Sequence, residues 1–150
     1  MATDILFVCL GNICRSPSAE AAMRKIAPAL QLDSAGTSGW HIGDPPYGPM
    51  QKAARRRGID LSDLSARQFV GADFERFDLI VAMDRDNQRD IEALRPQGNE
   101  TPVVLFAPYG DPGLSDVPDP YYTRDFEGVL DLIEQAAAAL LAQLEDSGRA

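Results

Sequence analysis

The sequence predicts an α/β fold of three layers, in which a twisted, four-stranded parallel sheet carries helices on both faces. Two observations lead to this prediction. Short apolar runs rich in β-forming residues alternate along the chain with segments of helical periodicity, which is the order of elements in doubly wound sheets. The 150 residues are 45% hydrophobic, which suffices for one domain with a buried core. We therefore expect residues 1–150 to form a single domain.

The first predicted unit is a strand, a tight loop and a helix. Residues 4–10 (DILFVCL) have the unbroken apolar character of a strand that is buried on both faces. Ser16 and Pro17 are typical of an N-cap and a first helical residue, and good helix formers follow until Pro28. A second strand is predicted over residues 32–37 (LDSAGT), before a long loop rich in glycine and proline.

The second half of the chain continues the alternation. The predicted elements are a helix over 50–57, a strand over 77–83, a polar helix capped by Asp84 and reaching about residue 94, and a strand over 102–106. A second long loop covers residues 107–122. In the final helix, apolar residues between Phe126 and Leu144 keep the i, i+3/i+4 spacing, so one face is predicted to pack on the sheet.

Charge and composition exclude several classes of protein. The chain has 14 Lys+Arg and 23 Asp+Glu, a net charge of −9, which repels nucleic acids and acidic lipid surfaces. Its longest apolar run, residues 5–10, is far shorter than the roughly 20 residues that span a bilayer. Two cysteines cannot form a secreted disulfide framework. We therefore expect a cytoplasmic protein with no nucleic-acid or membrane partner.

The strongest chemical signal lies in residues 9–15 (CLGNICR), which we call the Cys9 loop. Ligands of parallel sheets bind beyond the carboxyl ends of the strands, where this loop follows the first strand. A tight turn into a helix N-terminus directs successive N–H groups at one point, and Gly11 supplies the permissive backbone, so a phosphate-binding loop is expected. Arg15 can hold two oxygens of a tetrahedral anion, and the same dipoles favour an ionised, nucleophilic Cys9.

Three neighbours of Cys9 have roles inferred from their positions. The Ser16 hydroxyl can donate to the thiolate, and Asn12 can brace the loop. Cys14 is close enough in sequence for a disulfide, which needs Cα atoms about 4.4 to 6.8 Å apart. We expect a reversible Cys9–Cys14 disulfide that protects the nucleophile from irreversible oxidation. The alternative is structural, with both cysteines packed in the core and Arg15 on the helix surface.

An acid must protonate the leaving oxygen if a thiolate attacks a phosphate monoester. The single histidine, His41, falls in a different loop, so a carboxylate is the natural substitute. Asp119 is the candidate because Pro120 stiffens its segment and two tyrosines follow, as an aryl substrate would require. The alternative for this segment is a turn that introduces the last helix.

These motifs resemble the low-molecular-weight protein tyrosine phosphatases, through CLGNICRSPSAEA at 9–21 and DPYY at 119–122, with weaker matches over nearly the whole chain. The resemblance implies hydrolysis of phosphotyrosine and small aryl phosphates through a phosphocysteine on Cys9. Arg15 would bind the phosphoryl group, and Asp119 would act first as general acid and then as general base. The implied substrate pocket consists of Leu10, Gly11, Asn12, Ile13, Cys14, Ser16, Trp40, Tyr121 and Tyr122, with Asn12 and Ser34 as loop supports and Cys14 as the redox partner.

The resemblance further implies phosphotyrosine-containing proteins as substrates and a monomer or weak dimer. We expect no metal or cofactor, because the chemistry runs on a thiolate and an arginine. Many relatives carry a histidine that buttresses the loop asparagine where this chain has Leu64, so Asn12 is expected to be braced differently.

Four other functions compete with this interpretation. Thioredoxin-coupled arsenate reductases need two further cysteines, and arginine-phosphate phosphatases carry a threonine at the position of Ile13. A phosphocarrier would keep its phosphocysteine and lack a hydrolytic acid such as Asp119. A phosphotyrosine-binding module would need no thiolate.

Overall fold

The computed structural model describes residues 2–150 and has the predicted parallel sheet at its centre. Its strands are β1 (Ile5–Cys9), β2 (Leu32–Gly36), β3 (Leu79–Ala82) and β4 (Val103–Leu105), and their order in the sheet is β2-β1-β3-β4. β1 pairs with β2 on one side and with β3 on the other, in parallel register. A central strand is buried on both faces, which explains its unbroken apolar run.

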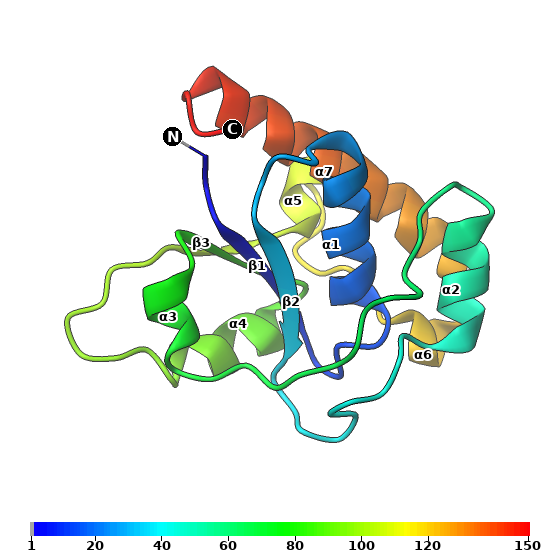
Figure 1. Cartoon of the computed structure of the whole chain (residues 1–150), viewed down its shortest axis with the longest axis horizontal. Helices are drawn as coiled ribbons and strands as arrows, with labels where there is room; N and C mark the ends of the chain where they lie inside the picture. The colour runs from blue at the N-terminus through cyan, green and yellow to red at the C-terminus, as the bar shows by residue number, and fades with distance from the viewer. Residues whose placement is uncertain (1) are drawn as a thin grey trace.

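Helices cover both faces of this sheet (Figure 1). Helices α1 (Arg15–Ile26), α5 (Ala107–Gly110) and α7 (Phe126–Asp146) lie on one face, and α3 (Asp73–Arg76) and α4 (Arg85–Glu92) lie on the other. Helix α2 (Gly48–Arg55) packs beside α7, and α6 (Pro120–Thr123) precedes α7. Side chains of β1 alternate between the two cores, with Phe7 and Cys9 toward α1 and α7 and with Leu6 and Val8 toward α3 and α4.

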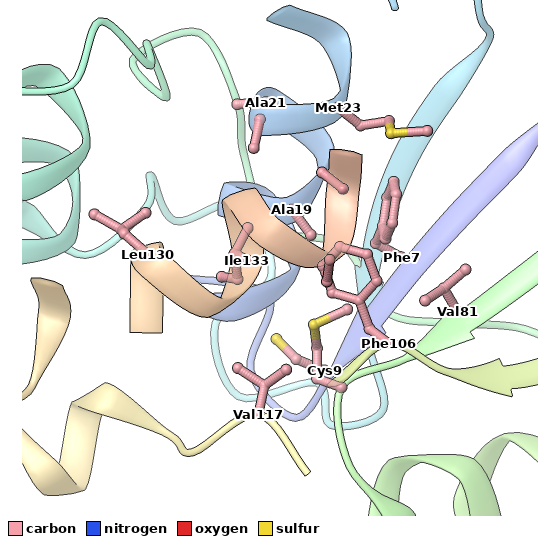
Figure 2. Close-up of a cluster of buried hydrophobic side chains, with 14 of the residues drawn as sticks. Phe7, Cys9, Ala19, Ala21, Met23, Val81, Phe106, Val117, Leu130 and Ile133 are labelled. Carbon is pink, nitrogen blue, oxygen red and sulfur yellow. The ribbon is translucent and has the colours of Figure 1, made fainter. Parts of the chain in front are cut away.

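The larger core is built around Phe7, which meets Phe106 edge to face at a centroid distance of 5.4 Å. Met23 of α1 and Ile133 of α7 pack into the same cluster, and each such buried side chain contributes about 1.5–3 kcal/mol. Figure 2 shows Cys9 at one end of this cluster. The core therefore extends into the Cys9 loop, since Ile13 and Cys14 belong to the same cluster.

The boundaries of several elements differ from the sequence-based prediction. Ser16 is not an N-cap, because α1 already starts at Arg15 and its N-cap residue, Cys14, makes no side-chain cap bond. The loop predicted over 107–122 contains the one-turn helices α5 and α6, and α3 was not predicted at all. The cap at Asp84 is confirmed, since its carboxylate accepts a hydrogen bond from the Asn87 backbone N–H at 2.7 Å.

Ion pairs attach α2 to α7. The Arg57 guanidinium contacts the carboxylates of Glu127, Asp131 and Glu134, and Arg56 contacts Glu127 as well. Burial opposes the charge on Arg57, but these acids raise its pKa well above the usual range. The attachment fixes the C-terminal end of α2 against α7. No helix within residues 2–150 is long and apolar enough to cross a membrane.

Gly110 is the point at which α5 approaches the backbone of α7. A Cβ atom there would lie 3.0 Å from the Ala136 nitrogen and 3.1 Å from the Leu132 oxygen. We expect Gly110→Ala to lower the free energy of unfolding by about 1–3 kcal/mol, measured by urea denaturation. Gly48→Ala is the matched control, since its Cβ would meet nothing within 4 Å. Equal losses in the two variants would contradict the steric explanation.

Candidate active site

The Cys9 loop curls around the sulfur at the end of β1. The Cys9 side chain is buried, and its Sγ accepts a hydrogen bond from the Asn12 backbone N–H at 3.2 Å. Asn12 adopts a positive φ of 58°, a left-handed conformation that asparagine tolerates better than most residues. The Ser16 Oγ lies 3.0 Å from the same sulfur. The loop therefore presents a cysteine surrounded by polar hydrogens.

A buried hydrogen-bond network supports Asn12 from behind. Its Nδ2 donates to Ser16 Oγ at 2.8 Å and to Ser34 Oγ at 3.0 Å. Its Oδ1 accepts from the Arg67 backbone N–H at 3.0 Å, while Leu64 packs against the core. The hydrogen bond from the Arg67 backbone therefore supports Asn12 in this chain, which has Leu64 at the position where many relatives have a supporting histidine.

The network continues to Glu20, a carboxylate that is only 3% exposed. Ser34 Oγ donates to Glu20 Oε1 at 2.7 Å, and Arg24 pairs with the other carboxylate oxygen. Burial raises the pKa of Glu20, and the bonds from Ser34 and Arg24 oppose that shift only in part. A partly solvated ion pair thus terminates a chain of hydrogen bonds that starts at the Cys9 sulfur.

Close packing of backbones keeps the loop against β2. A Cβ atom on Gly36 would lie 2.7 Å from the carbonyl oxygen of Leu10 and 3.1 Å from the carbonyl carbon of Gly11. Gly36 is therefore required for the approach of the two segments, a function that its place in a predicted strand did not reveal.

Arg15 connects three segments of the chain. Its Nη1 donates to Asp84 Oδ2 at 2.7 Å and to the Val117 carbonyl at 3.0 Å, and its Nη2 donates to Asp119 Oδ2 at 3.4 Å. Burial lowers the pKa of Arg15, but Cys9 and the two aspartates raise it above the ordinary value, so the guanidinium stays charged. Asp84 was expected only to cap a helix. The structure shows that its carboxylate also pairs with Arg15.

Asp119 caps α6 and faces Arg15 with the same carboxylate. Its Oδ1 accepts from the Tyr121 backbone N–H at 3.1 Å, and its Oδ2 is the partner of Arg15. Its side chain is 24% exposed, so the carboxylate is open to a ligand. The turn that introduces the last helix is a separate feature, since Asp125 caps α7 through the Gly128 N–H.

These groups meet in a pocket of about 190 Å³. Its lining brings together most of the residues expected from the sequence: Cys9, Leu10, Gly11, Ile13, Cys14, Arg15, Trp40, Asp119, Tyr121 and Tyr122. Asn12, Ser16 and Ser34 do not line it; they lie behind the loop as supports. Trp40 and Tyr122 are mostly exposed and form its rim.

His41 also lines the pocket, although the sequence analysis placed it in a different loop. Its Nδ1 lies 3.1 Å from Asp44 Oδ2, and its ring sits 3.1 Å from the position that a Cβ on Gly11 would occupy. A contact between a loop after β2 and the Cys9 loop depends on β1 and β2 being neighbours. Trp40 was expected at the pocket. Because His41 is its neighbour in the sequence, His41 could have been predicted to lie there as well.

Cys14 is a buried, free thiol, as is Cys9. Burial raises the pKa of Cys14 to about 12, with further contributions from Cys9 and Asp119. Cys14 is therefore protonated at neutral pH. Within residues 2–150, no three His, Cys, Asp or Glu side chains gather where they could hold a metal ion.

Comparisons with known proteins agree on one family. The family model described as "Low molecular weight phosphotyrosine protein phosphatase" matches residues 4–150. The chain is 43% identical over 149 residues to the low molecular weight protein-tyrosine-phosphatase YfkJ of Bacillus subtilis, covering 95% of this chain and 96% of the relative. It is 44% identical over 127 residues to the low molecular weight phosphotyrosine protein phosphatase of Schizosaccharomyces pombe, covering 79% and 81%.

Solved structures give the same result. The crystal structure of YfkJ from Bacillus subtilis superposes with a TM-score of 0.91 at 42% identity and covers 98% of this chain and 97% of its own. A protein tyrosine phosphatase from Entamoeba histolytica, crystallised with Hepes in the active site, has a TM-score of 0.90 at 35% identity and covers 98% and 99%.

The buried Glu20 generates a prediction about pH. Because its pKa is raised in the folded protein, the unfolded chain loses this proton at lower pH than the folded protein does. The folded state therefore loses stability as pH rises above the ordinary pKa of a glutamate. We expect the free energy of unfolding of Glu20→Gln, relative to wild type, to increase from about pH 4 to about pH 7, measured by urea denaturation.

An exposed acid supplies the control for this measurement. Glu145→Gln also removes one negative charge, but from a side chain at the surface near the end of α7. The free energy of unfolding relative to wild type should therefore increase with pH for Glu20→Gln and not for Glu145→Gln. A difference between Glu20→Gln and wild type that decreases with rising pH would contradict the prediction.

Proposed function

The chain belongs to the low molecular weight phosphotyrosine protein phosphatase family and is a protein tyrosine phosphatase, and we propose that Cys9, Arg15 and Asp119 carry out its reaction. One observation carries this proposal: a single buried guanidinium, that of Arg15, closes the Cys9 loop and contacts the Asp119 carboxylate at 3.4 Å. Cys9, Arg15 and Asp119, the proposed nucleophile, anion-binding cation and acid, all border one pocket.

In the first proposed step, the Cys9 thiolate attacks phosphorus and the P–O bond to the aryl group breaks. The loop N–H groups and Arg15 hold the phosphoryl oxygens, which concentrates positive charge where negative charge develops. The substrate phosphate competes with Asp119 for the Arg15 Nη2, which releases that carboxyl to face the leaving oxygen. Asp119 donates its proton to that oxygen, so a neutral phenol leaves and a phosphocysteine remains.

In the second proposed step, Asp119 acts in the opposite direction. Its carboxylate takes a proton from water while the water oxygen attacks phosphorus, and the S–P bond breaks to give phosphate and the Cys9 thiolate. Ser16 supports this departure, because Asn12 Nδ2 donates to its Oγ and leaves the hydroxyl hydrogen free to point at the sulfur 3.0 Å away. Neither step requires a metal or another cofactor.

The pocket walls support aryl phosphates as substrates. Tyr121, Tyr122 and Trp40 provide aromatic faces. Ile13 adds an apolar contact, whereas the threonine of arginine-phosphate phosphatases would present a hydroxyl to the guanidinium of the substrate. We propose that phosphotyrosine-containing proteins are the physiological substrates. A single domain over residues 1–150, a monomeric or weakly dimeric state and a cytoplasmic location stay predictions from the sequence.

The mechanism is tested with p-nitrophenyl phosphate at about pH 6, without added metal, by stopped-flow absorbance. Cys9→Ser should show no turnover, and Asp119→Ala should lower kcat by about 10²-fold or more because it removes the general acid. Tyr109→Phe removes a tyrosine hydroxyl on α5, outside the pocket lining, and should behave as wild type. If wild type releases one equivalent of phenol and stops, the chain is a phosphocarrier and the hydrolytic proposal fails.

The proposal includes a reversible disulfide. Peroxide converts the Cys9 thiolate to a sulfenic acid, and attack by the Cys14 sulfur then expels water to form the S–S bond. Because the pKa of Cys14 is about 12, its thiolate fraction is small at neutral pH, so closure should accelerate as the pH rises.

Mass spectrometry after mild peroxide treatment measures this disulfide. We expect the wild type to lose the mass of two hydrogens and to recover activity with dithiothreitol, and Cys14→Ser to gain oxygens that dithiothreitol does not remove. A wild-type protein that yields only the sulfinic acid would refute the disulfide.

A further inference from the structure

The general acid of the proposed mechanism sits on a weakly supported part of the chain, which we call the Asp119 segment (residues 118–125). Val117, just before it, is buried and donates its N–H to the Met83 carbonyl at 2.8 Å. Beyond Val117 the segment is largely exposed, and α6 is a single turn. One isolated turn of helix is not stable in water, so contacts with the rest of the protein must hold Asp119 in place.

Tyr47 provides a firm point opposite this segment. It is the N-cap residue of α2, and its backbone N–H donates to the Ile13 carbonyl in the Cys9 loop at 2.8 Å. Its ring lies 5.1 Å from the ring of Tyr121 and 6.1 Å from that of Phe126, measured between centroids. Tyr47 therefore joins the loop that carries Cys9 to Tyr121 within the Asp119 segment and to Phe126 just after it.

Arg124 closes the connection from the other side. It ends α6 with a φ of 64°, a left-handed conformation that is unfavourable for a residue other than glycine. Its Nη1 donates to the Tyr47 hydroxyl at 2.8 Å, and its Cζ lies 5.3 Å and 5.1 Å from the ring centroids of Tyr47 and Phe126. The unfavourable backbone conformation of Arg124 thus accompanies a hydrogen bond to the Tyr47 hydroxyl and contacts between the guanidinium and the rings of Tyr47 and Phe126.

We propose that Arg124 and Tyr47 form a clasp that holds α6, and with it the Asp119 carboxyl, over Cys9. Both are positioning residues, because neither lines the pocket that contains Cys9 and Arg15. The inference rests on the proposed role of Asp119 as general acid. It adds two residues, far apart in the chain, on which proton transfer to the leaving oxygen depends.

The clasp has a kinetic signature that a general loss of stability would not produce. A displaced acid slows the expulsion of a poor leaving group more than that of a good one, because only the poor one needs the proton early. Variants of the clasp should therefore lose kcat/KM in a way that depends on the leaving group.

The experiment compares phenyl phosphate with p-nitrophenyl phosphate in Arg124→Gly, Arg124→Asn and Tyr47→Phe. Glycine and asparagine both accept the left-handed backbone, so these two variants remove the guanidinium without adding strain. We expect kcat/KM to fall by about 10-fold for phenyl phosphate and by about 2-fold for p-nitrophenyl phosphate. Tyr109→Phe is the control for loss of a tyrosine hydroxyl. Equal losses for both substrates, or no loss, would overturn the clasp.

A second measurement separates failure of the clasp from failure of the proposed mechanism. Amide hydrogen exchange reports directly on α6, where the Thr123 and Arg124 N–H groups bond to the Asp119 and Pro120 carbonyls. We expect faster exchange at these amides in the clasp variants, and unchanged exchange would overturn the clasp. Asp119→Asn should show the same leaving-group pattern more strongly. If it does not, the acid assignment fails, and amide exchange alone decides whether the clasp holds α6.

Discussion

A buried cation organises this molecule. The Arg15 guanidinium is only 3% exposed, and a charge removed from water needs partners of opposite sign or a polar backbone. It finds them in Asp84, Asp119 and the Val117 carbonyl, which come from the start of α4 and from the long segment before α7. The partners that this one side chain requires therefore bring the Cys9 loop and Asp119 to the same pocket.

The two sides of the Cys9 loop differ in how firmly they are held. Behind the Cys9 loop, Asn12 links Ser16, Ser34 and the Arg67 backbone, and such a buried, well-bonded network resists rearrangement. In front of the loop, Asp119 caps a single helical turn at the surface. The Cys9 loop is thus held firmly from behind, whereas the Asp119 segment is held through contacts between side chains.

Much of the fold followed from local patterns in the sequence. The four strands, the cap at Asp84 and the final helix were predicted because apolar periodicity and capping act over a few residues. The N-cap at Ser16 was wrong, because the hydroxyl that typifies a cap is used by the Cys9 sulfur instead. The one-turn helices α3, α5 and α6 were missed, since contacts with the body of the protein determine whether so short a segment is helical.

The sequence by itself determined the family and the parallel α/β class, because short apolar runs, helical periodicity and the continuous Cys9 motif are all local patterns. Only the tertiary structure decided that Asp84 and Asp119, which lie 69 and 104 positions after Arg15, share its guanidinium, and that His41 reaches the pocket. It likewise paired Arg124 with Tyr47, 77 positions earlier. Such pairs leave no local pattern, since they exist only when the parallel strands bring their carboxyl ends to one edge of the sheet.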